Sequence, residues 1–191
     1  MRCGKPIEDD TGEYCHDCML RDFFYTRGAA AFSYTDGMKR SMYAFKYNNR
    51  REYGKFYSKI IYNNYCDMIK SWNADVLIPV PLHPKRYRKR GYNQAQVLAE
   101  DIGRKFNIPV DTKILIRSKN TIPLKELSDK ERKVHIENAF QVVCDITKYK
   151  KAILVDDIYT TGATVNECAS VLKESGMEKI YFITACIGNG F

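Results

Sequence analysis

Two adjacent carboxylates followed by a run of hydroxyl and glycine residues are the part of this sequence best suited to chemistry. Asp156 and Asp157 come directly after the apolar residues 152–155, and a hydroxyl-rich turn at 160–164 follows them. Carboxylate oxygens accept hydrogen bonds from hydroxyls or bind a metal ion. Free backbone amides at the start of a helix bind phosphate. These residue types in this order indicate a ligand that carries a phosphate and vicinal hydroxyls, as a ribose 5-phosphate does.

A strand and the helix after it would position these residues. The apolar run 152–155 predicts a buried parallel strand, and residues 163–175 predict a helix. The two carboxylates then lie at the carboxyl end of a strand, where open α/β sheets hold ligands. One alternative is an ordinary strand-loop-helix with a solvated acidic turn. Another is the Walker B strand of a nucleotide triphosphatase, which requires a G-x-x-x-x-G-K-[ST] loop that this sequence lacks.

The stretch 152–164 resembles the phosphoribosyl-pyrophosphate signature of the type I phosphoribosyltransferases, and every position of the motif matches. In that family the acidic pair contacts the ribose 2- and 3-hydroxyls, and the Thr/Gly loop wraps the 5-phosphate. The resemblance implies that Asp156 and Asp157 are the catalytic pair. It also implies that the ligand phosphate is bound by Thr160, Thr161, Gly162, Ala163 and Thr164.

A second segment combines a strand end with a dense group of cations. Residues 75–81 predict a strand ended by two prolines, and a basic loop at 82–91 contains Lys85, Arg86 and Arg88. We interpret this loop as a second anion-binding end of the same sheet. The alternative is a solvated loop. His83 and His135 are interpreted as ordinary surface or core histidines rather than catalytic bases.

This second segment also resembles the ComF (competence protein F) family of bacterial phosphoribosyltransferase-like proteins. The resemblance rests on Val80-Pro81, on residues 90–94 and 127–140 and on the first cysteines, and it covers nearly the whole chain. It implies that residues 82–88 hold pyrophosphate, that residues 117–132 form a mobile loop over the ribose, and that Mg²⁺ binds with phosphoribosyl pyrophosphate. Leu124 stands where the family usually has Gln.

Three of the seven cysteines lie near the start of the chain. Cys3 is followed by glycine, as at the second ligand of a zinc knuckle, and Cys15 and Cys18 form a C-x-x-C pair. A structural zinc site needs four ligands, so we expect a knuckle whose first ligand, just before Met1, is cut off. His16 as the fourth ligand and three free thiols are the alternatives. The other four cysteines are predicted to be core residues.

The length of 191 residues suits one α/β domain with a small appendage. Strands alternate with helices from residue 75 onward, which predicts a parallel sheet flanked by helices. We expect a cysteine-bearing head at 1–22 and a phosphoribosyltransferase-like domain at 23–191, with a hood at 23–74. Hydrophobic periodicity predicts helices at 36–47, 52–72 and 93–106, and strands at 29–34, 110–116, 140–143 and 181–187.

The net charge of +8 favours anionic partners such as phosphorylated metabolites, nucleic acid or acidic lipid. No apolar run reaches the roughly 18 residues of a membrane span, and no signal peptide is apparent, so a cytoplasmic location is expected. Two functions fit these observations. The first is a magnesium-dependent phosphoribosyltransferase acting on an unidentified base or amine.

The second function is a single-stranded DNA-binding competence factor that works with other DNA-uptake proteins and retains a non-catalytic sugar-phosphate pocket. The resemblance to the ComF family implies a role in natural transformation. The basic segments and the fourteen tyrosines, which could stack on bases, support this second hypothesis.

Overall fold

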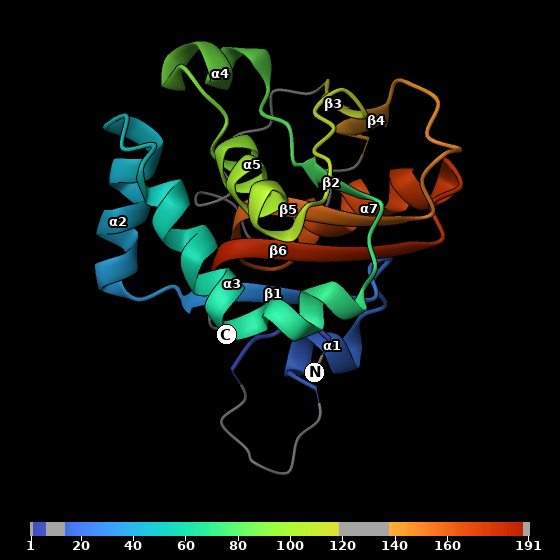
Figure 1. Cartoon of the computed structure of the whole chain (residues 1–191), viewed down its shortest axis with the longest axis horizontal. Helices are drawn as coiled ribbons and strands as arrows, with labels where there is room; N and C mark the ends of the chain where they lie inside the picture. Colours follow the sequence, from blue (N-terminus) through green and yellow to red (C-terminus); the bar gives the residue numbers. More distant parts are fainter. Residues whose placement is uncertain (1, 7–13, 119–137, 189–191) are drawn as a thin grey trace.

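A four-stranded parallel sheet in the order β1-β6-β5-β2 lies at the centre of the molecule (Figure 1). The structure is a computed structural model and describes residues 2–6, 14–118 and 138–188. The strands of the sheet are β1 (Arg27–Ser33), β2 (Val76–Pro79), β5 (Lys151–Tyr159) and β6 (Lys179–Ile187). Two short strands, β3 (Leu115–Arg117) and β4 (Phe140–Val142), pair separately in an antiparallel sheet.

Helices cover both faces of the sheet. In Figure 1 the helices α3 and α5 lie in front of it and α7 lies behind it. The described helices are α1 (His16–Leu20), α2 (Asp36–Tyr47), α3 (Tyr53–Ser71), α4 (Pro84–Arg90), α5 (Gln94–Phe106) and α7 (Ala163–Glu174). The expected α/β class, with a parallel sheet flanked by helices, is confirmed.

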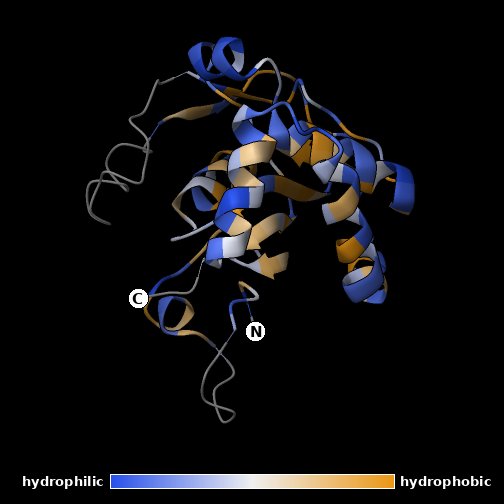
Figure 2. Cartoon of the chain, turned by 90° about the vertical axis from the view of Figure 1, so that its left-hand side faces the viewer, coloured by the Kyte–Doolittle hydropathy of each residue, from blue (hydrophilic) through white to orange (hydrophobic). Residues whose placement is uncertain are grey.

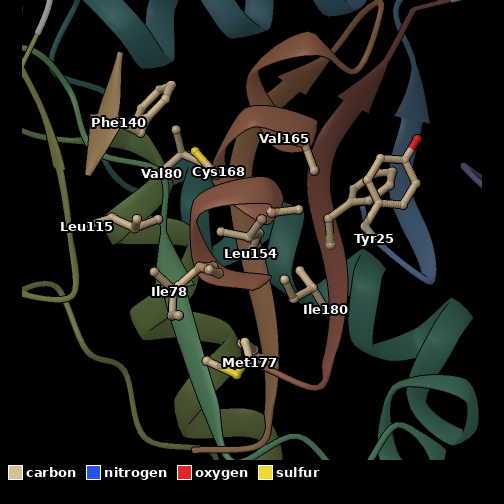
Figure 3. Close-up of a cluster of buried hydrophobic side chains, with 14 of the residues drawn as sticks. Tyr25, Ile78, Val80, Leu115, Phe140, Leu154, Val165, Cys168, Met177 and Ile180 are labelled. Carbon is tan, nitrogen blue, oxygen red and sulfur yellow. The ribbon is translucent and has the colours of Figure 1, made fainter. Parts of the chain in front are cut away.

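The alternation of side chains along β5 divides the core into two clusters. Ala152 and Leu154 belong to the cluster on the α7 side, which Figure 3 shows with Leu154 beside Val165. Ile153 and Val155 belong to the cluster that includes the buried residues of α3 and α5. Because successive residues of a strand point to opposite faces, a continuous apolar run is what a strand covered on both faces requires.

The basic segment expected to be a loop at 82–91 forms the helix α4. Pro84 occupies the first turn, where its fixed φ suits a helix and its missing N–H costs nothing. The His83 Nδ1 atom accepts a hydrogen bond from the Lys85 amide at 3.2 Å. Gly91, with φ of 77°, ends the helix in the left-handed conformation. The loop prediction for this segment is therefore wrong, because local capping outweighs the repulsion among the cations.

The strand expected at 110–116 is shorter than predicted. Val110 makes an isolated parallel bridge to Leu77, and the Asp111 carboxylate then accepts a hydrogen bond from the Lys113 amide at 2.9 Å. A side-chain contact of this kind turns the backbone away from an extended path. Regular pairing resumes only at Leu115.

The first residues of the chain pack along the outer edge of β1. The Gly28 amide donates a hydrogen bond to the Arg2 carbonyl at 2.8 Å, and the Arg2 guanidinium donates to the Phe23 carbonyl at 2.6 Å. Cys3 is buried in the same hydrophobic cluster as Tyr25. The described residues of the head are thus in direct contact with the sheet.

The distribution of hydropathy follows the layers of the fold. Figure 2 shows hydrophobic strands in the interior, while α4 at the top of the molecule is hydrophilic. Within the ranges that the structure describes, no helix is long and apolar enough to cross a membrane.

Candidate functional site

A pocket of about 200 Å³ lies at the carboxyl ends of β2 and β5. Charged and hydroxyl side chains from five parts of the chain meet in its walls. They are Lys46, Arg86, Arg90, Arg117, Asp156, Asp157, Thr160 and Thr164. The pocket therefore brings together the acidic pair, part of the expected phosphate loop and four cations.

The acidic pair lies within β5 rather than after it. Strand pairing with β6 continues through Asp156↔Thr184 to Tyr159↔Ile187. The two side chains leave the strand in opposite directions, yet both line the pocket at the carboxyl end of the sheet. The Asp157 amide donates a hydrogen bond to Asp156 Oδ1 at 2.8 Å. The two acids therefore have different surroundings although they are adjacent in sequence.

Asp157 forms an ion pair with Lys46 of α2. The Nζ atom of Lys46 lies 2.8 Å from Asp157 Oδ2, and the two side chains are only 18 % and 15 % exposed. Lys46 lies outside every motif of the sequence. Its position in the sequence could have indicated a paired charge, because Lys46 follows the buried Phe45 and lies one turn after the buried Met42. A charged side chain next to the apolar face of a helix needs a partner.

Asp156 is the more desolvated of the two acids. Burial and the neighbouring charge of Asp157 raise the pKa of Asp156 to about 7, while Lys46 and Arg117 act in the opposite direction. Asp156 therefore keeps its proton to a higher pH than an exposed aspartic acid does. A protonated carboxyl group donates a hydrogen bond, whereas Asp157 beside Lys46 is an acceptor.

Three guanidinium groups form the cationic side of the pocket. Arg86 and Arg90 are four residues apart on α4 and so share a helix face, and Arg117 is the last residue of β3. Arg117 is 8 % exposed. Burial and the charge of Arg86 lower the pKa of Arg117. Repulsion of this kind is relieved by an anion between the groups, so this side of the pocket suits a multiply charged ligand.

Side-chain contacts hold Arg90 in place. Its guanidinium lies over the ring of Tyr47, 5.1 Å from the ring centroid, and donates to Gln94 Oε1 at 2.9 Å. Lys85 and Arg88, which the basic segment predicts as ligand contacts, are exposed on other sides of α4 and do not line the pocket. Of the three cations expected here, Arg86 lines the pocket.

The hydroxyl-rich turn leads from β5 into α7. Thr160 and Thr164 line the pocket, while Thr161 and Ala163 do not. Gly162 precedes the first residue of α7 with φ of 79°. A Cβ atom at Gly162 would lie 2.3 Å from the Tyr159 hydroxyl, so both the backbone and the packing require glycine here.

Tyr159 also connects this turn to the cysteine-bearing head. Its hydroxyl and that of Tyr25 share a buried hydrogen bond at 2.6 Å. Tyr25, Tyr159 and Cys3 belong to one cluster, against which Cys15 and Cys18 pack. The Nζ atom of Lys5, which pairs with Asp17, lies 5.9 Å from the centroid of the Tyr159 ring.

The sulfur atoms of Cys3, Cys15 and Cys18 lie within 4.8 Å of one another, close enough for one ion to contact all three. The Sγ atoms of Cys3 and Cys15 are 3.4 Å apart. Among the described residues, the imidazole of His16 is not part of this group. Three thiolates fit the soft donor set that zinc prefers. Cys168 and Cys186 are buried, whereas Cys144 is exposed and was expected to be a core residue.

The mobile loop expected at 117–132 lies, apart from Arg117 and Ser118, outside the described residues. The same holds for Leu124, for His135 and for most of the stretch 127–140 that supports the resemblance to the ComF family.

Comparison with known proteins identifies relatives that span most of this chain. Competence protein F of Haemophilus influenzae is 28 % identical over 183 residues, which covers 93 % of this chain and 80 % of that protein. Competence protein ComFC of Bacillus subtilis is 30 % identical over 180 residues, covering 91 % and 71 % respectively. The DNA utilization protein YhgH of Escherichia coli is 24 % identical over 175 residues, covering 90 % and 77 %.

No protein-family model matches the chain. Among solved structures, the purine phosphoribosyltransferase from Pyrococcus horikoshii aligns with 70 % of this chain and 88 % of its own, with a TM-score of 0.42 and 12 % identity. A likeness at this level says nothing about the ligand of this chain. The sequence relationship to the competence proteins, maintained over about nine tenths of the residues, is decisive: the chain belongs to the ComF (competence protein F) family.

Proposed function

We propose that the pocket binds phosphoribosyl pyrophosphate or a related sugar phosphate, and that the protein acts in DNA uptake during natural transformation. The observation that carries the first part is the meeting of three complementary groups in one pocket. An acidic pair, two threonines at the start of a helix and three arginines line the same space. A phosphorylated sugar with a diphosphate group presents the matching hydroxyls and anions.

Each group has a role in this proposal. Asp156 and Asp157 bind the ribose hydroxyls, and the turn 160–164 binds the 5-phosphate through its hydroxyls and backbone amides. Arg86, Arg90 and Arg117 bind the diphosphate. Lys85 and Arg88, which are exposed beside the pocket, would contact only a longer polyanion.

The same arrangement suits transfer of the phosphoribosyl group to a base or amine. Displacement of pyrophosphate builds negative charge on the leaving group, and fixed guanidinium groups stabilise that charge. The Asp156–Asp157 pair fits poorly as a direct magnesium site, because Lys46 already occupies one carboxylate. Magnesium, which neutralises diphosphate charge when bound, would enter on the diphosphate oxygens of the ligand.

The relatives support the role in DNA uptake. The matched proteins are named competence proteins and DNA utilization proteins. Single-stranded DNA binding is the second candidate function, and one observation favours it. The exposed rings of Tyr43 and Tyr47 lie 4.9 Å apart on α2, and Arg90 lies over the Tyr47 ring. Aromatic rings beside cations bind single strands by stacking and charge.

We further propose that Cys3, Cys15 and Cys18 hold a structural zinc ion. The cysteine cluster packs against Tyr25 and Tyr159, so an ion held there would support the core. Elemental analysis of the purified protein tests this assignment. We expect about one zinc per chain, lost in Cys15→Ser and retained in Cys144→Ser, whose cysteine is exposed. A metal-free native protein would contradict it.

Calorimetric titration with phosphoribosyl pyrophosphate in the presence of magnesium tests the pocket. We expect native binding and a loss of about tenfold or more in Asp156→Asn/Asp157→Asn, because hydrogen bonds to charged groups contribute about 1.5–3 kcal/mol each. The matched control is Asp111→Asn, which removes an acid outside the pocket. Equal heats for the native protein and the double variant would exclude the proposed pocket.

A further inference from the structure

We infer that Lys46 takes the place of a metal ion at Asp157, so that the pocket binds the ribose end of a sugar phosphate without a divalent cation at the acidic pair. The inference rests on the proposed function and assigns a positioning residue that the sequence pattern of the signature does not contain. Magnesium could bind either at the diphosphate or at the sugar hydroxyls. In this proposal it binds only at the diphosphate.

The geometry of the ion pair supports this assignment. Lys46 and Asp157 come from different layers of the fold, α2 and β5, and their charged atoms meet at 2.8 Å on the wall of the pocket. Both side chains are largely removed from solvent. A buried ammonium group is tolerated only when it is paired. The position of each group therefore depends on the other.

Magnesium usually binds proteins through one or two carboxylates, with waters and substrate oxygens completing its coordination, but at Asp157 a carboxylate oxygen already pairs with Lys46. The Oδ2 atom of Asp157 is occupied by Lys46, and Oδ1 of Asp156 accepts the Asp157 amide. An ion that bound Asp157 through Oδ2 would have to displace Lys46.

The ion pair matches a pair of neighbouring hydroxyls better than it matches a metal. An ammonium group has three donors, of which Asp157 uses one in the described contacts. The carboxylate retains acceptor capacity on its other lone pairs. One sugar hydroxyl can therefore donate to Asp157 while its neighbour accepts from Lys46. The ammonium group supplies the positive charge that a metal would otherwise provide.

The other groups around Asp157 leave this role to Lys46. Asp156, the neighbouring acid, cannot supply a positive charge to Asp157. Tyr57 and Cys186 face Asp157 from α3 and β6, and burial raises the pKa of both to about 12, so both are neutral. Arg86 on α4 is the other cation with an electrostatic interaction with Asp157.

The decisive experiment uses ribose 5-phosphate, which has the sugar hydroxyls and a phosphate but no diphosphate. Its dissociation constant is measured by calorimetry with millimolar MgCl₂ and with EDTA. The proteins are native, Lys46→Met, Lys46→Arg and Lys39→Met. Lys39 is the matched control because it lies on the same helix and pairs with Asp36 at its exposed surface. Inorganic phosphate serves as the second probe, because it reports the phosphate turn alone.

For the native protein we expect magnesium to change the affinity for ribose 5-phosphate by less than about twofold. Lys46→Met is expected to weaken it about tenfold or more, as loss of a charged hydrogen bond does, and magnesium should then restore part of the affinity. Lys46→Arg retains the ion pair, so its affinity for ribose 5-phosphate should be close to that of the native protein. Lys39→Met should also bind as the native protein does. The affinity of Lys46→Met for inorganic phosphate should fall only about two- to threefold, because only one distant charge is removed.

Two results overturn the inference while leaving the proposed function intact. One is a native affinity for ribose 5-phosphate that requires magnesium. The other is equal binding by Lys46→Met and Lys39→Met. Failure of the native protein to bind either probe is a different outcome, which rejects the proposed function and the inference with it. If Lys46→Met does not fold, Lys46→Gln, which retains a donor without the charge, is judged by the same criteria.

Discussion

The hydroxyl groups of Tyr25 and Tyr159 lie 2.6 Å apart and share a buried hydrogen bond. Tyr25 comes just before β1, whereas Tyr159 ends β5 immediately before the phosphate turn. The ring of Phe182 packs against both, at 4.8 Å from each ring centroid. This contact connects the cysteine cluster, the sheet and the start of the turn 160–164 within one buried cluster.

Removal of one of these hydroxyls should destabilise the protein. Tyr25→Phe or Tyr159→Phe leaves the remaining hydroxyl buried without its partner, which costs about 1–3 kcal/mol. The double variant removes both polar groups and should lose less than the sum of the single changes. Urea unfolding of the four proteins measures these free energies. Additive losses would show that the hydroxyls do not interact.

Replacement of Gly162 should disturb the phosphate turn. In Gly162→Ala the new Cβ would lie 2.3 Å from the Tyr159 hydroxyl, and the backbone has a φ of 79°. Gly176→Ala is the matched control, because Gly176 also has a positive φ but no atom within 4 Å of the added carbon. Both should lose about 1 kcal/mol of stability through the backbone. Only Gly162→Ala should also lose affinity for inorganic phosphate, measured by calorimetry; equal affinities would contradict this prediction.

The pKa of Asp156 predicts a dependence of stability on pH. Burial and Asp157 raise this pKa to about 7, whereas an aspartate in an unfolded chain titrates near about 3.9. Between these values the folded state binds more protons than the unfolded state, so stability falls as pH rises through this range. Asp156→Asn removes this contribution. Its unfolding free energy, measured in urea at about pH 5 and about pH 8, should fall less than that of the native protein. Parallel curves would show that Asp156 does not titrate there.

Two arginines on α4 allow the two proposed functions to be separated. Arg86 lines the pocket, whereas Arg88 is exposed outside it. Arg86→Gln should weaken phosphoribosyl pyrophosphate binding about tenfold, as loss of a charged hydrogen bond does. Arg88→Gln should instead weaken single-stranded DNA and lower its salt slope by about 0.7, the value for one phosphate contact. Calorimetry and salt-dependent DNA titrations measure the two effects. Identical responses would place both ligands on one surface.

Contiguous patterns account for what the sequence predicts well. The strand, acidic pair, turn and helix at 152–175 follow one another in the chain, and the structure contains β5 and α7 there. Helices α2, α3 and α5 are also predicted within a few residues, because each has an apolar stripe of helical period. The parallel sheet follows from the alternation of strands and helices.

The remaining site residues come together only in three dimensions. Lys46 lies more than a hundred residues before Asp157 in the chain, and Arg117 ends a strand of three residues. Lys46 belongs to no motif, and Arg117 is predicted only as the first residue of a mobile loop, so neither could be assigned to the pocket from residue spacing. The helical form of 84–90 was missed for a local reason. Its run of like charges is typical of a loop, whereas Pro84 and Gly91 supply the ends of a helix.

The hydrogen bond between the Gly28 amide and the Arg2 carbonyl has a consequence for the association of this protein with itself. β1 is the outermost strand on its side of the sheet, and an uncovered outermost strand offers unpaired amides and carbonyls to other chains. Residues 2–4 cover this edge strand and keep other chains from pairing with it. A shortened protein that began after residue 22 would expose the edge of β1. Such a protein should form oligomers in which β1 pairs with a strand of another chain.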